Sequence, residues 1–80
     1  MENKIAVIAT VVKDANAVDG VNALFHEFSS YIVGRMGLPL KERGISVINV
    51  VLDAPIEIIN NLSGKLGMIE NVSSKVLVTK

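Results

Sequence analysis

Side chains able to carry out chemistry are scarce in this sequence, which has one histidine, His26, and no cysteine. A protein metal site needs several histidine, cysteine or carboxylate ligands at close spacing, and only Asp19 and Glu27 lie near His26 in the sequence. The scattered serines lack a nucleophile motif, so a Ser-His-Asp mechanism is not indicated. We therefore expect a chain that is not an enzyme, with no catalytic residues, no metal and no cofactor. We interpret His26 as a solvated or interface residue.

The segment Gly34–Gly44 is the most unusual part of the chain, because it gathers Arg35, Lys41 and Arg43 between two predicted strands. It is longer than the two to five residues that usually connect a hairpin. Guanidinium groups bind carboxylates and phosphates well. The segment indicates either an anion-binding or partner-docking arm, or a solvated hairpin in which Glu42 offsets the positive charge.

The turn around Asp14 and Asn16 is a second candidate binding region, because it precedes a predicted helix. The free N–H groups at a helix start attract a carboxylate or a phosphate, although the Asp14 carboxylate can occupy them as a cap. We predict that a small anionic ligand or an acidic protein partner contacts Asp14, Asn16, Arg35 and Arg43.

The elements that must position these residues follow from hydrophobic periodicity. Ile5–Val12 and Ile45–Leu52 are apolar at both parities, which is typical of central strands. We expect strands near residues 4–12, 31–37, 45–52 and 72–79, and helices near 15–29 and 55–66. Two apolar stripes at helical spacing support the helices, namely Val18, Val21, Phe25 and Phe28 in the first, and Ile58, Ile59, Leu62 and Leu66 in the second.

The expected ends of the helices depend on capping residues. Asp14 or Asn16 is the predicted N-cap of the first helix. Asp53 and Pro55 predict the start of the second, since proline is tolerated in a first turn. Gly67 stands where a left-handed residue often ends a helix.

The order β-α-β-β-α-β predicts an α+β fold of the ferredoxin-like type, with an antiparallel sheet in the order 4-1-3-2 and both helices on one face. Side chains alternate across a strand, so Ile5, Val7 and Val11 share one face while Ile8 and Val12 share the other. The helices can cover only one of these faces. We therefore predict self-association, as a homodimer or a higher oligomer, to cover the remaining aliphatic side chains.

The bulk composition limits the classes of function. The chain has 80 residues, 50% of them hydrophobic, and a net charge of zero, which predicts a single domain over residues 1–80 and excludes a disordered tail. A neutral chain lacks the basic stripe that nucleic acids or anionic membranes require. The longest unbroken apolar run, Ile5–Ala9, is too short to cross a bilayer. We expect a cytoplasmic protein, and the absence of cysteine fits this.

Several segments resemble a known family, most specifically the Gly-Arg-Met-Gly stretch within Ile32–Pro39. Together with Leu24–Phe28, Arg43–Ile48 and Leu62–Gly67, it makes the chain similar to small bacterial proteins described as candidate regulators of the iron-only hydrogenase system. That family is similar to ACT-type regulatory domains and to the C-terminal domain of the nickel-responsive repressor. The resemblance implies a ferredoxin-like fold, self-association, and sensing rather than catalysis.

The resemblance leaves the ligand open. Amino-acid-binding ACT domains usually place a glycine soon after the acidic residue of the first strand-helix turn, whereas here Gly20 comes later than Asp14. The nickel-repressor domain uses several histidines and a cysteine, and His26 alone cannot replace them. Our leading hypothesis is a stand-alone, ACT-like ligand-sensing module. The alternatives are a protein-binding adaptor or structural module, and a small dimeric ferredoxin-like oxygenase or isomerase, for which no acid–base set is present.

Overall fold

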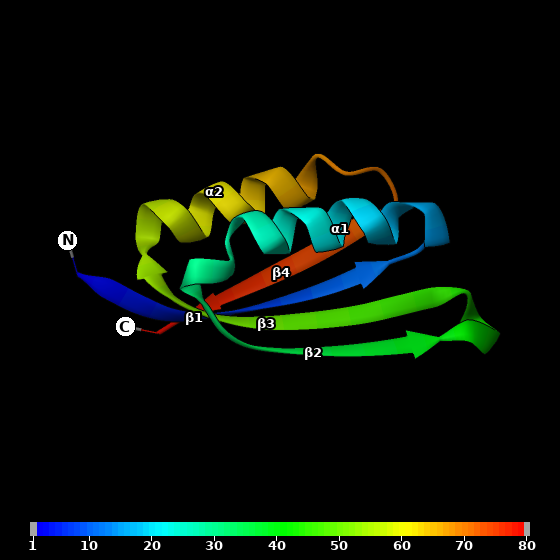
Figure 1. The fold of residues 1–80 in the computed structure, drawn as a ribbon, viewed down its shortest axis with the longest axis horizontal. Helices are drawn as coiled ribbons and strands as arrows, with labels where there is room; N and C mark the ends of the chain where they lie inside the picture. Colours follow the sequence, from blue (N-terminus) through cyan, green and yellow to red (C-terminus); the bar gives the residue numbers. More distant parts are fainter. Residues whose placement is uncertain (1, 80) are drawn as a thin grey trace.

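Four strands and two helices make up the computed structural model, which describes residues 2–79 (Figure 1). The strands are β1 (Asn3–Val12), β2 (Ile32–Leu40), β3 (Ile45–Pro55) and β4 (Val72–Val78). The helices are α1 (Ala15–Glu27) and α2 (Ile56–Gly67), and short 3-10 turns occupy Ser29–Tyr31 and Lys41–Arg43. All six predicted elements are therefore present.

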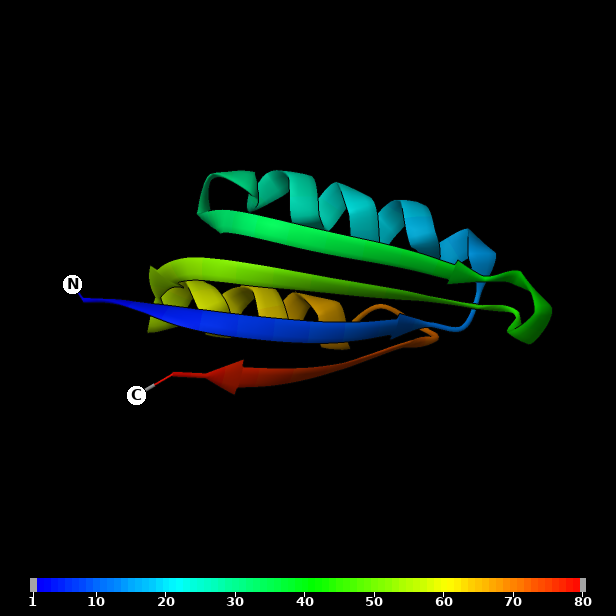
Figure 2. The same cartoon turned by 90° about the horizontal axis from the view of Figure 1, so that it is seen from below.

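The sheet is antiparallel throughout, with the strands in the order β2-β3-β1-β4. Read in reverse, this is the predicted order 4-1-3-2, so the ferredoxin-like α+β fold is confirmed. Both helices lie on the same face of the sheet, as Figures 1 and 2 show from two directions. The two most apolar strands, β1 and β3, are the central pair.

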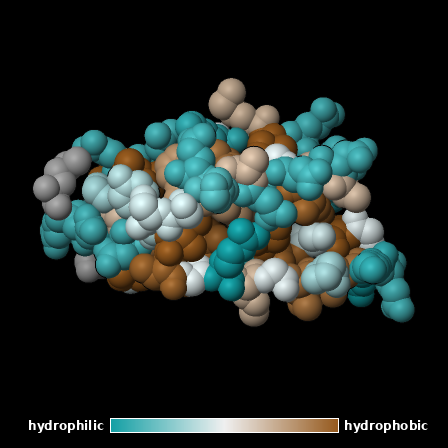
Figure 3. Space-filling model, viewed as in Figure 1, coloured by the Kyte–Doolittle hydropathy of each residue, from teal (hydrophilic) through white to brown (hydrophobic). Residues whose placement is uncertain are grey.

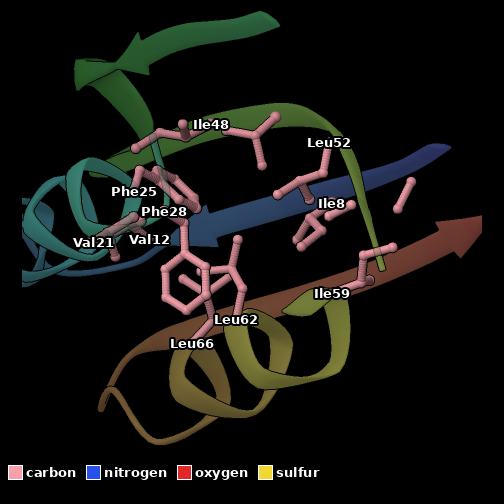
Figure 4. Close-up of a cluster of buried hydrophobic side chains, with 13 residues drawn as sticks. Ile8, Val12, Val21, Phe25, Phe28, Ile48, Leu52, Ile59, Leu62 and Leu66 are labelled. Atoms are coloured by element: carbon pink, nitrogen blue, oxygen red, sulfur yellow. The ribbon is translucent and has the colours of Figure 1, made fainter. Parts of the chain in front are cut away.

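The core lies between the sheet and the two helices (Figure 4). The predicted helix stripes supply much of it, because Val21 and Phe25 from α1 and Leu62 from α2 are almost completely buried. Alternate residues of β1 and β3 meet them from the sheet. The strand residues that face the helices and are buried are Ala6, Ile8, Thr10, Val12, Ile48, Val50, Leu52 and Ala54.

The predicted N-cap of α1 is confirmed, but the predicted role of Asp53 at the start of α2 is wrong. Asp14 is the N-cap of α1 and its Oδ1 accepts the N–H of Asn16 at 3.0 Å. Asp53 does not cap α2, because it is still in β3 and pairs with Ile5 of β1. The extra strand pairing carries β3 through Pro55 before the helix begins.

The predicted left-handed residue at the end of α2 is also wrong. Gly67 is the last residue of the helix. Among the described residues the left-handed backbone occurs instead at Asn71, with φ 67°, and at Gly44, with φ 68°. Asparagine and glycine are the residues that adopt this conformation most readily.

The predicted long connection between β2 and β3 is a further correction. Strand β2 continues to Leu40 and pairs with β3 as far as Ile45, so only Lys41–Gly44 connects the two strands. Pro39 is tolerated within β2 because this strand is at the edge of the sheet. The basic residues of the segment therefore belong to a long, narrow hairpin that extends beyond the helices (Figure 2).

The face of the sheet opposite the helices carries many aliphatic side chains, as predicted. Ile5, Val7 and Leu38 are all more than a third exposed, and Leu77 on β4 is 71% exposed. Apolar atoms reach the surface along the lower side of the molecule in Figure 3, where the sheet lies. The described chain leaves this face uncovered.

Leu62→Ala should remove a large share of the stability of the fold. Leu62 is fully buried between α2 and the sheet, and truncating such a leucine costs about 2–5 kcal/mol. An 80-residue domain has only about 4–12 kcal/mol in total. Urea unfolding followed by circular dichroism measures the loss. Met68→Ala is the matched control, since Met68 is 86% exposed, and equal losses for the two variants would contradict this core.

Candidate functional site

A groove runs between α1 and β2 and continues toward the β2–β3 hairpin. It consists of two adjoining hollows of about 250 Å³ each, which share Val18, Pro39 and Ser46. We call this the α1–β2 groove. The hollow nearer the hairpin is further lined by Val12, Ala15, Lys41, Gly44 and Ile45, and the other by Asn22, Arg35, Gly37, Leu38 and Ile48.

The groove exists because the inward residues of β2 leave space beneath α1. The pairing of β2 with β3 turns Arg35, Gly37 and Pro39 toward the helices. A glycine, a proline and a flexible cation fill less of the interlayer space than the aliphatic side chains that β1 and β3 place on the same face. The edge strand is therefore the place where the core stops and a hollow begins.

Arg35 connects the two walls of the groove. Its Nη2 donates a hydrogen bond of 2.7 Å to Oδ1 of Asn22 on α1. Its guanidinium carbon lies 5.5 Å from the centre of the Phe25 ring, which is the geometry of a cation–π contact. A guanidinium has five N–H donors, so the contact with Asn22 leaves donors for a further acceptor.

Asp14 and Asn16 lie at the start of α1, and the structure gives them a role in capping. Besides the bond between Asn16 and the Asp14 carboxylate, the Asp14 carbonyl accepts the N–H of Ala17 at 2.9 Å. Neither residue lines the α1–β2 groove, although their neighbour Ala15 does. Ligand contact by Asp14 and Asn16 stays a prediction.

Arg43 lies in the exposed turn at the tip of the hairpin and does not line the α1–β2 groove. It lines a wide, open hollow of about 600 Å³ formed by residues 39–43 alone. Arg35 and Arg43 thus occupy different hollows, and the four predicted site residues are not gathered into one.

Sequence reasoning missed two polar residues of the groove, Asn22 and Ser46, and did not place Lys41 in it. The charge of Lys41 is evident from the sequence, but its place in the groove depends on how far β2 extends. Asn22 lies one helical turn before Phe25 and His26. That spacing identifies a shared helix face but not the edge strand that packs against it.

The charge of the groove is one-sided. Arg35 lines one hollow and Lys41 lines the other, and within residues 2–79 no acidic side chain lines either. Most of the remaining lining is aliphatic. Such a surface suits a small anion with an apolar portion.

Residues 2–79 offer neither a metal site nor a membrane-spanning helix. No group of three or more histidine, cysteine or acidic side chains is placed to hold a metal ion there, and His26 is exposed on α1. Nor does that part of the chain contain a helix with the length and apolar character needed to cross a bilayer.

The structure defines a small ferredoxin-like α+β domain with a groove of modest size between α1 and β2. The chain belongs to the TM1266-like family, described as "Iron-only hydrogenase system regulator, putative", whose sequence model matches residues 4–76. This confirms the resemblance seen in the sequence.

A solved structure supports the same assignment. The chain is similar to the structure of the uncharacterized protein TM1266 from Thermotoga maritima, with 38% sequence identity and a TM-score of 0.94. The similarity covers 99% of this chain and 100% of that one. A comparison with curated proteins gave no match.

Arg35→Ala should destabilise the fold by about 1 kcal/mol, because it removes an exposed cation–π contact and one hydrogen bond. Thermal unfolding of this variant and of Asn22→Ala and the double variant measures how far the two side chains depend on each other. Arg43→Ala, in the hairpin tip, is the control and should leave the melting temperature unchanged. A fully additive double variant would contradict the contact between Arg35 and Asn22.

Proposed function

We propose that this chain is an ACT-like regulatory module that senses a small anionic ligand and has no catalytic activity of its own. The observation that carries the proposal is the α1–β2 groove, with a basic side chain in each hollow and no acidic lining residue among residues 2–79. Membership of the TM1266-like family supports a regulatory role linked to the iron-only hydrogenase system. We place this role in the cytoplasm.

The size of the groove limits the ligand. Each hollow measures about 250 Å³, which is below the roughly 300–1,000 Å³ of typical small-molecule sites. The basic side chains suit a carboxylate or a phosphate, and Val18 and Ile45 suit a short aliphatic portion. The proposed ligand class is therefore a small organic anion.

The position of the groove supports sensing through a change in the position of the β2–β3 hairpin relative to α1. Its lining comes from α1 on one side and from β2 and the hairpin on the other. A ligand held between Lys41 and α1 would fix the hairpin relative to the helix layer. A ligand can shift a conformational equilibrium only through such a difference in contacts between two states.

Self-association is part of the same proposal. The described chain has no disulfide, and small domains without such a constraint often gain stability from oligomerisation. The uncovered sheet face offers the surface for it. A homo-oligomer would also allow a ligand bound to one copy to affect its neighbour.

A protein-binding adaptor is the second candidate function. The observation that favours it is the exposed hairpin tip, where Lys41, Glu42 and Arg43 surround an open hollow. Such a tip could dock on an acidic surface without any small molecule.

A thermal-shift screen over short carboxylates, inorganic phosphate, nucleotides and divalent metals tests the proposal. We expect small organic anions to raise the melting temperature, on the order of 5–10 °C at tenfold excess over Kd. Lys41→Ala should abolish this shift because it removes one of the two groove cations. Lys65→Ala, on α2 and outside the groove, is the matched control and should retain it. A flat screen would overturn ligand sensing and leave the adaptor.

A further inference from the structure

The outer face of the sheet, opposite the helices, is apolar and electrically balanced. Among the strand residues that point to this face, the charged side chains are Asp53 on β3 and Lys75 on β4. A nucleic acid or an anionic membrane requires an excess of positive charge, which this face lacks. One charge of each sign on an aliphatic background is compatible with a second copy of the same face.

The strand register aligns residues in rows across the sheet, and one row has a leucine at one edge and a glycine at the other. The row crosses the sheet through Gly34, Val51, Val7 and Leu77. Leu77 on β4 is 71% exposed, whereas Gly34 has no side chain, and a Cβ built there meets nothing within 4 Å. The outer surface of this row therefore projects at the β4 edge and is recessed at the β2 edge.

A second row has its large side chain at the other edge of the sheet. It crosses the sheet through Leu38, Val47, Val11 and Ser73. Here the large side chain, Leu38, is on β2 and is half exposed, while the small Ser73 is on β4. Each edge strand therefore offers one projection and one depression.

A two-fold axis that runs parallel to the strands, between two such faces, brings these features together. This rotation sets β2 of one copy against β4 of the other and keeps each row opposite itself. Leu77 then meets Gly34 of the second copy, and Leu38 meets Ser73. Lys75 faces Met36, because these two residues end the row between the others.

The alternative two-fold axis, across the strands, is disfavoured by charge. It keeps each strand opposite itself, so that Lys75 meets Lys75 of the second copy when the faces are centred on the middle row. Directly opposed like charges destabilise an interface. The axis parallel to the strands avoids this contact.

The area available is sufficient for a small dimer. Four strands at about 4.8 Å spacing and about eight residues of length give a face of about 500 Å² on each copy. Two such faces reach the roughly 1,000 Å² that a specific interface needs.

A polar group in the middle of the face also lacks a partner. Oδ1 of Asn49, on the central strand β3, is buried and accepts no hydrogen bond from residues 2–79. An unpaired buried amide is costly. The axis parallel to the strands passes between β3 and β1, so it brings the two Asn49 side chains of a dimer near each other.

We propose that the outer sheet face is covered by a second copy of this chain, related by a two-fold axis parallel to the strands, with Leu77 of each copy seated on Gly34 of the other. The inference rests on the self-association included in the proposed function and assigns it a surface and a geometry.

Moving the leucine of the first row from β4 to β2 tests the proposal. Gly34→Leu should raise the dimer dissociation constant about 10- to 100-fold by overpacking the contact with Leu77. The double variant Gly34→Leu/Leu77→Ala should return it to within about threefold of the natural value, because each leucine again faces a small residue. Sedimentation equilibrium measures the constants, and circular dichroism confirms that each variant is folded. Gly64→Leu, at an exposed position of α2 where a Cβ meets nothing within 4 Å, is the control and should leave the constant unchanged.

The outcomes separate this inference from the proposed function. A natural chain that stays monomeric would overturn both this interface and the proposed self-association, while ligand sensing is tested by the thermal-shift screen. A dimer that Gly34→Leu does not weaken would overturn only the assigned face. A dimer weakened by Gly34→Leu but not restored in the double variant would overturn the axis. If Gly34→Leu does not fold, Leu77→Lys must still weaken the dimer, or the proposal fails.

Discussion

The alternation of side chains across β1 and β3 is the constraint on which the rest of this structure depends. Both strands are aliphatic at both parities, so each needs apolar cover on two faces. The helices supply one cover through Phe25, Leu62 and their neighbours, which bury the apolar residues on the inner face of the central pair. Within residues 2–79 both helices lie on one side of the sheet, and no helix covers the other. The fold thus creates an unmet requirement for burial.

The α1–β2 groove lies where this regular packing ends. Strand β2 is at the edge and turns Arg35, Gly37 and Pro39 toward α1, where β1 and β3 present aliphatic residues. Arg35 holds α1 to the edge strand through Asn22 and Phe25 without filling the space beside them. One hydrophobic layer therefore accounts for both features. The outer face is apolar because β1 and β3 are aliphatic on both faces. A groove remains at the edge because β2 turns Arg35, Gly37 and Pro39 toward α1.

The sequence predicts what is encoded locally and misses what depends on pairing. The runs Ile5–Val12 and Ile45–Leu52 identify the central strands because β-branched residues there have no other favourable arrangement. The sequence predicts an edge strand that ends near residue 37 and a long connection after it, yet β3 pairs with β2 as far as Leu40. Asp53 likewise looks like a helix cap until its pairing with β1 is known.

For the site, Arg35 was predicted from its residue type, but its partners on α1 follow from the register of a distant strand. The most direct test of the account is whether the outer face is covered in solution. Methyl NMR with a soluble paramagnetic probe compares Leu77 on that face with buried Ile8 and exposed Met68. The account predicts that at high protein concentration the Leu77 methyls are protected as Ile8 is, and that dilution exposes them. Leu77 methyls broadened as strongly as that of Met68 at every concentration would contradict it.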